Sequence, residues 1–131
     1  MNNGTDTVTT GKFYDSGGND SNYANSENLT LTFYPKVNGE MVSIEFSMVD
    51  IESGYDSLMV HDGTDTNAPQ LQGSPVSGSS IPSSAFTASN ALGALTLKFV
   101  SDNIQNQKGW EADINCAGPS EVDQEQQICK T

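Results

Sequence analysis

Four carboxylates gather around one short connection between two strand-like runs. The runs are Phe46 to Met48 and Leu58 to Val60, and the acids between and beside them are Asp50, Glu52, Asp56 and Asp62. Carboxylates this close in sequence repel one another unless solvent or a cation intervenes. Carboxylate oxygens are also the ligands that a hard cation such as calcium prefers. The connection is therefore either a solvated acidic tip or one part of a calcium site.

A second acidic loop, Ser101-Asp102-Asn103, follows a strand-like run that ends near residue 99. The chain lacks the spacing of a helix-loop-helix calcium hand, and both acidic loops are flanked by strand patterns instead. A calcium site would therefore have to combine ligands from both loops at one end of a sheet structure. From the residues alone, solvated charge and a metal site both remain open, because the many acids of this chain must lie somewhere on its surface.

Other chemistry finds little support. The one histidine, His61, stands at a strand end, where we expect it on the surface, and no Gly-x-Ser-x-Gly motif accompanies it. Asp50 and Asp56 could act as a glycosidase pair only if one of them occupied an apolar pocket. The glycines at Gly17 and Gly18 are not followed by the lysine and helix of a phosphate-binding loop. The sequence predicts no enzyme.

Charge and composition indicate which binding partners and which cellular location the protein can have. Seventeen acids against five basic residues give a net charge of −12, which argues against binding to nucleic acid or to anionic membranes. No apolar run approaches the roughly 20 residues of a membrane helix, and the first residues carry no targeting pattern. A surface rich in Asn, Ser, Thr and Gly is typical of secreted domains, so we expect an extracellular protein without membrane insertion.

Two cysteines, Cys116 and Cys129, lie near the C-terminal end. With one histidine in the chain they cannot complete a four-ligand zinc site. A disulfide between them is the economical interpretation in an oxidising compartment, and two free thiols are the alternative.

Hydrophobic residues alternate with polar ones in four segments, 29–33, 42–48, 95–99 and 110–114. Turn-forming residues separate these segments, and no helical stripe occurs between them. This pattern predicts an all-β fold, an antiparallel β-sandwich without significant helix. Its expected core comprises Leu31, Phe33, Ile44, Phe46, Leu58, Val60, Leu97, Phe99 and Trp110.

The length fits one domain. We expect a flexible N-terminus at residues 1–6, the sandwich at 7–116, and a C-terminal tail or linker at 117–131. Residues 11–28, rich in Gly, Asn, Asp and Ser, are predicted to form a loop held by its aromatic residues Phe13, Tyr14 and Tyr23.

The order of motifs resembles a CUB domain, a secreted β-sandwich module, in its bacterial form. The motif F-x-x-F-D-x-E followed by Y-D-x-L-x-V-x-D-G is similar to residues 46–52 and 55–63, and FYDSGGNDSNY resembles the first loop of the family. The closing motifs L-x-L-x-F-x-S-D and G-F/W-x-A-x-Y match residues 95–102 and 109–114. One departure is that Gly54, and no cysteine, precedes Tyr55.

The resemblance implies one calcium ion held by Glu52, Asp56 and Asp102, with Asn103 or the backbone carbonyl near Ile104 as a neighbouring ligand. It also implies that Tyr23 hydrogen-bonds the ligand cage. Because the connection is shorter than in many family members, Asp50 could take the part of Glu52.

The resemblance further implies a non-catalytic recognition module of a larger secreted protein, in which calcium-holding acids accept a basic side chain of a secreted or cell-surface protein partner. The alternative is a carbohydrate-binding module that binds a glycan by stacking on tyrosines. Its candidates are Tyr14, Tyr23, Tyr34 and Tyr55.

Overall fold

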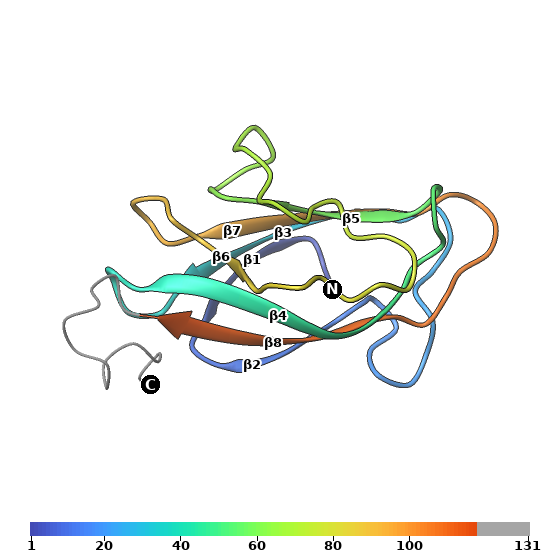
Figure 1. Cartoon of the computed structure of the whole chain (residues 1–131), viewed down its shortest axis with the longest axis horizontal. Coiled ribbons are helices and arrows are strands. Elements are labelled where there is room, and N and C mark those ends of the chain that lie inside the picture. Colours follow the sequence, from blue (N-terminus) through green and yellow to red (C-terminus); the bar gives the residue numbers. More distant parts are fainter. Residues whose placement is uncertain (118–131) are drawn as a thin grey trace.

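Two four-stranded sheets pack face to face in the computed structural model, which describes residues 1–117 (Figure 1). One sheet has the order β1 (Gly4–Val8), β3 (Asn28–Pro35), β7 (Leu95–Val100) and β5 (Ser57–His61). The other has the order β2 (Gly11–Tyr14), β8 (Gly109–Ala117), β4 (Met41–Asp50) and β6 (Phe86–Thr87). Residues 1–117 contain no helix, and so no helix that could cross a membrane. The predicted all-β sandwich is confirmed.

Strand register brings three connections to one end of the sandwich. In the first sheet Asn28 and Ser57 both pair with Val100, and in the second Asp50 pairs with Gly109. The β2–β3, β4–β5 and β7–β8 connections therefore all start or finish at this end, on the right in Figure 1. We call these three connections, residues 15–27, 51–56 and 101–108, the loop end.

The inward faces of both sheets form one core. Every predicted core residue is at most 8 % exposed. A chain of aromatic rings extends this core toward the loop end: the ring centroids of Trp110 and Phe99 are 4.9 Å apart, and those of Phe99 and Tyr23 are 4.8 Å apart. Aromatic rings that pack edge to face bury a large apolar area and prefer a defined relative orientation. The first loop is thereby anchored to the interior by Tyr23.

Two segments of the N-terminal part are strands that the sequence analysis did not predict. Residues 11–14 form β2 rather than loop, because Phe13 enters the core while the alternation is too short to stand out. β1 begins at Gly4, within the segment expected to be flexible, and it is held by parallel pairing with β3. Its exposed residues have no apolar periodicity by which the sequence could reveal a strand.

His61 was also misplaced by the sequence pattern. It is 6 % exposed, and its Nδ1 lies 2.8 Å from the carbonyl oxygen of Ala68, to which it donates a hydrogen bond. The long connection after β5 folds back over the strand end and covers the ring. At the C-terminal end, Cys116 lies in β8, whereas Cys129 is outside the described residues, so their pairing stays a prediction.

Asp15 follows β2 directly and is 1 % exposed. A side-chain carbon at Gly109 would overlap its carboxyl group, which explains why a glycine stands at the start of β8. Burial raises the pKa of Asp15 from 3.8 to about 7. The folded state therefore holds this proton more tightly than the unfolded chain does.

A group whose pKa is raised by folding contributes stability below its unfolded pKa and loses it as the pH rises through its folded pKa. Between pH 5 and pH 8 the free energy of unfolding should fall more for the wild-type protein than for Asp15→Asn, as measured by urea denaturation. Asp20→Asn, which neutralises an exposed acid of the same loop, should keep the wild-type dependence. Equal pH dependence in wild type and Asp15→Asn would contradict this assignment.

Candidate metal centre

Three acids from two connections meet at the loop end. One carboxylate oxygen each from Glu52, Asp56 and Asp102 lies within 4.8 Å of the other two. Glu52 and Asp56 are brought together by a tight turn, in which the amide of Asp56 donates to the carbonyl oxygen of Glu52 at 3.0 Å. Gly54 has a φ of +84° in this turn, a conformation that favours glycine. Asp102 follows β7 and reaches the pair from the adjacent connection.

Asp56 is the fixed member of this acidic cluster. It is 1 % exposed, and its Oδ2 accepts a 2.6 Å hydrogen bond from the hydroxyl of Tyr23. Its Oδ1 accepts a 2.9 Å hydrogen bond from the backbone amide of Asp102. The carboxylate thus holds the β7–β8 connection against the β4–β5 turn.

Tyr23, which lies in the β2–β3 connection, hydrogen-bonds two residues of the β4–β5 turn. Its hydroxyl donates to Asp56 and accepts a 3.1 Å hydrogen bond from the backbone amide of Glu52. Burial raises the pKa of the phenol, and the hydrogen bond to Asp56 raises it further, so the hydroxyl keeps its proton as a donor. Its backbone amide also donates to the carbonyl oxygen of Gln107 at 3.2 Å, so Tyr23 links all three connections of the loop end.

Glu52 carries the unsatisfied charge of the cluster. It is 9 % exposed, and its Oε1 is buried without a hydrogen-bond partner among the described residues. Burial raises the pKa of its carboxyl group, and the charges of Asp102 and Asp56 raise it further. Buried acceptors rarely stay unpaired in folded proteins. A cation between the three carboxylates would supply the missing partner and remove the repulsion.

The spacing of the oxygens suits calcium. Calcium–oxygen distances of 2.3–2.6 Å allow ligands on opposite sides of one ion to be about 5 Å apart, and the three carboxylate oxygens fall within that span. Magnesium requires about 2.1 Å and a nearly ideal octahedron. The residues present therefore fit a calcium ion.

Two further residues proposed from sequence lie outside this cluster. Asp50 ends β4, paired with Gly109, and contributes no oxygen to the group. Asn103 is exposed on the β7–β8 connection beside Asp102. Of the two acids between which the sequence could not decide, Glu52 is the one that meets Asp56 and Asp102.

Sequence reasoning missed the serines that support the site. The hydroxyl of Ser101 accepts from the amide of Glu27 and donates to the carbonyl oxygen of Ala24, both at 2.8 Å. The hydroxyl of Ser77 donates to the backbone oxygen of Asp56 at 2.7 Å. Ser101 is itself a residue of the S-D motif, but the motif did not reveal these two hydrogen bonds. Ser77 lies in a distant connection, and no pattern in the sequence points to it.

A comparison with protein-family models matches residues 3–114 to the CUB domain. The chain belongs to the CUB domain family. The matched region is thus a non-catalytic module. A comparison with curated protein sequences found no match.

Solved structures share the fold at low sequence identity. The human MASP-1/3 CUB1-EGF-CUB2 structure matches with a TM-score of 0.72 and 22 % identity, over 88 % of this chain and 42 % of that one. The full extracellular region of zebrafish Gpr126/Adgrg6 matches with a TM-score of 0.70 and 19 % identity, over 98 % of this chain and 15 % of that one. The MASP-1 CUB2 domain bound to Ca²⁺ matches with a TM-score of 0.66 and 21 % identity, over 87 % of this chain and 98 % of that one. The first two relatives are far longer than this chain.

Removing the Tyr23 hydroxyl tests whether it holds the loop end together. Tyr23→Phe leaves Oδ2 of Asp56 and the amide of Glu52 without their partner, and should lower the free energy of unfolding by about 1–3 kcal/mol in calcium-free buffer. Tyr55→Phe removes the same atom from a residue that is 70 % exposed and should change stability by less than about 0.5 kcal/mol. Equal effects in urea denaturation would contradict the role of Tyr23.

Proposed function

We propose that this CUB domain binds one calcium ion through Glu52, Asp56 and Asp102 and uses the ordered loop end to recognise a basic side chain of a protein partner. The observation that carries the proposal is the meeting of these three carboxylates around a buried, unpartnered oxygen of Glu52. A calcium-bound relative with the same fold adds support. Asn103, which follows Asp102, supplies a further oxygen ligand, whereas Asp50 lies outside the coordination sphere.

Calcium prepares the surface rather than taking part in any reaction. Bound between the β4–β5 and β7–β8 connections, it fixes the carboxylates, whose outer lone pairs accept an ammonium or guanidinium group in charge-assisted hydrogen bonds. The net charge of −12 steers cationic partners toward the domain. Partners of this kind would be secreted or cell-surface proteins, and the domain would act extracellularly as a module of a larger, bacterial secreted protein.

Two exposed apolar side chains flank the acids. Tyr55 is 70 % exposed and immediately precedes Asp56, while Ile104 is 60 % exposed and follows Asp102 by two residues. Large apolar groups beside a charged centre are typical of protein-binding surfaces, where they exclude water from the central polar contact. These residues would pack against the stem of the incoming basic side chain and its neighbours.

A site that exists only in the folded chain stabilises that chain by mass action. Calcium at 100 times its dissociation constant should add about 2.7 kcal/mol to the free energy of unfolding and raise the melting temperature, with a smaller effect of magnesium. Glu52→Gln and Asp102→Asn should each abolish the shift. Asp50→Asn removes an equal charge from the same end and should retain it.

Differential scanning calorimetry with and without a chelator measures this shift, and titration calorimetry checks uptake of a single ion. Asp56 is avoided as a test position because it also accepts two structural hydrogen bonds. Unchanged melting in millimolar calcium, or loss of the shift in Asp50→Asn alone, would overturn the assignment.

Recognition of basic groups is tested on a poly-L-lysine surface at physiological ionic strength. Calcium should increase binding to this surface, because the ordered carboxylates then form specific hydrogen bonds to lysine side chains. This gain should exceed the loss of general electrostatic attraction that the added positive charge causes. Tyr55→Ala and Ile104→Ala should weaken the calcium-dependent part. Leu92→Ala, which truncates an equally exposed residue at the opposite end, should not. Binding that calcium reduces would mean unspecific attraction and refute the recognition mechanism.

A further inference from the structure

The turn of the metal centre is held from outside by a segment of the long β5–β6 connection. We call this segment, residues 76–78, the clamp segment. Gly78 exchanges two backbone hydrogen bonds, of 2.8 and 2.9 Å, with Ile51, which precedes the turn. Val76 exchanges two more, of 2.7 and 2.9 Å, with Leu58, which follows the turn. The clamp segment therefore bridges the turn from one flank to the other.

The middle residue of the clamp segment, Ser77, bonds the turn itself. Its hydroxyl donates to the carbonyl oxygen of Asp56 at 2.7 Å and lies 3.3 Å from the carbonyl oxygen of Glu52. Glu52 and Asp56 begin and end the turn, and they are two of the three acids that meet at the loop end. One hydroxyl group thus connects the backbone of both acids to the clamp segment.

The clamp segment has a fixed position of its own. The side chain of Val76 is 3 % exposed and belongs to the core. Gly78 has a φ of +75°, a conformation that favours glycine, and the chain continues from it into the exposed residues 79–81. Because one end of the segment is packed in the core, Ser77 contacts the turn from a site that the rest of the sandwich determines.

The turn needs this outer restraint because its acids repel one another when no cation is bound. Tyr23 restrains the turn from the core side, through the amide of Glu52 and the carboxylate of Asp56. Ser77 restrains the same two residues through their carbonyl oxygens. If the turn opened in the calcium-free protein, fewer molecules would be ready to bind the ion. The apparent dissociation constant would rise in the same proportion.

We propose that Ser77 is a positioning residue of the metal centre and that its contact with the turn sets the affinity for calcium. The hydroxyl acts through the backbone of Glu52 and Asp56, whose carboxylates hold the ion. The role of Ser77 rests on the calcium site proposed above. It extends that site to the β5–β6 connection, 21 residues from Asp56 and 25 from Glu52 in the sequence.

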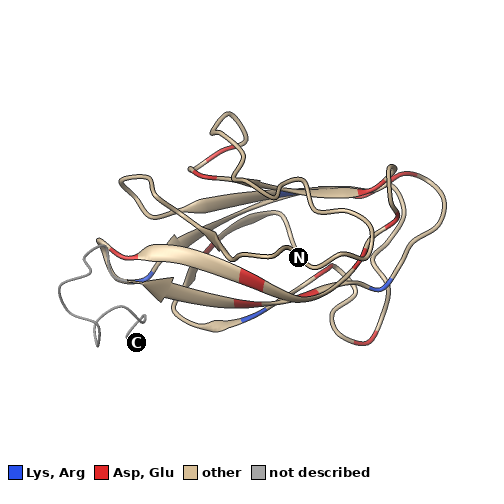
Figure 2. Cartoon of the chain, in the orientation of Figure 1, with Lys and Arg blue, Asp and Glu red and all other residues tan. Residues whose placement is uncertain are grey.

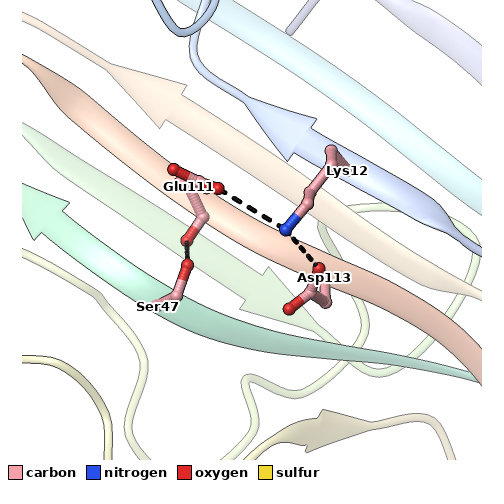
Figure 3. A network of polar contacts seen from close by, with 4 residues as sticks. All are labelled: Lys12, Ser47, Glu111 and Asp113. Carbon is pink, nitrogen blue, oxygen red and sulfur yellow. Dashed lines mark hydrogen bonds and ion pairs between the residues drawn. The ribbon is translucent and has the colours of Figure 1, made fainter.

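Titration calorimetry on the full chain measures the calcium affinity directly. Ser77→Ala removes the hydroxyl and should raise the calcium dissociation constant about tenfold, as is typical when a group that supports a metal ligand is lost. Ser77→Thr keeps a hydroxyl and should restore most of the affinity. Ser47→Ala is the matched control, because Ser47 of β4 also donates to a backbone carbonyl, that of Glu111 at 3.1 Å, but lies outside the turn (Figure 3). It should bind calcium like the wild type.

Urea denaturation in the presence of a chelator separates positioning from a general effect on stability. A purely structural Ser77 would lower the free energy of unfolding without changing the calcium dissociation constant, and that result would overturn the proposal. Equal losses of affinity in Ser77→Ala and Ser77→Thr, or in Ser77→Ala and Ser47→Ala, would also overturn it. If the wild type takes up no calcium, the metal centre itself fails. If the wild type binds calcium and Ser77→Ala binds it equally well, only the role of Ser77 is rejected.

Discussion

The hydroxyl of Tyr23 is the contact on which the loop end depends. It donates to Asp56 and accepts from the amide of Glu52, while its ring packs edge-to-face on Phe99 in the core. A polar group that is buried and fully paired is costly to disturb, because each partner would be left without a hydrogen bond in a low-dielectric environment. Because Tyr23 is anchored in the hydrophobic core, it fixes the positions of acids that lie in connections between strands.

Repulsion between carboxylates opposes this arrangement of the loop end. Acids are spread over both sheets and most connections (Figure 2), which keeps many of them solvated and separated. The three carboxylates of the metal centre lie close together instead, because the turn and the β7–β8 connection hold them in place. Glu52 then carries a raised pKa and an unpaired oxygen. A fold that retains such an arrangement is most easily understood when a cation is part of its working state.

The β2–β3 connection supports the metal centre through Tyr23, whose hydroxyl donates to Asp56. A backbone hydrogen bond of 3.2 Å from Tyr23 to Gln107 fixes this connection against the one that leads into β8. Anchored at this aromatic residue, the connection is held against both of its neighbours at the loop end.

The sequence by itself determined the sandwich and its core, and it pointed to Asp56 and Asp102 together with either Glu52 or Asp50. Alternation over five or more residues revealed the longer strands, such as those containing Phe46 and Phe99, because burial of one sheet face imposes a period of two. The family resemblance predicted Glu52, with Asp50 as the alternative, Asp56 and Asp102 as ligands and Tyr23 as their hydrogen-bond partner. Tertiary structure decided what local pattern could not express: that β1 and β2 are strands, that His61 is buried, and that Glu52 rather than Asp50 meets Asp56. It also showed the support from Ser77. These features arise from contacts between segments distant in sequence, so no single stretch of the chain contains their cause.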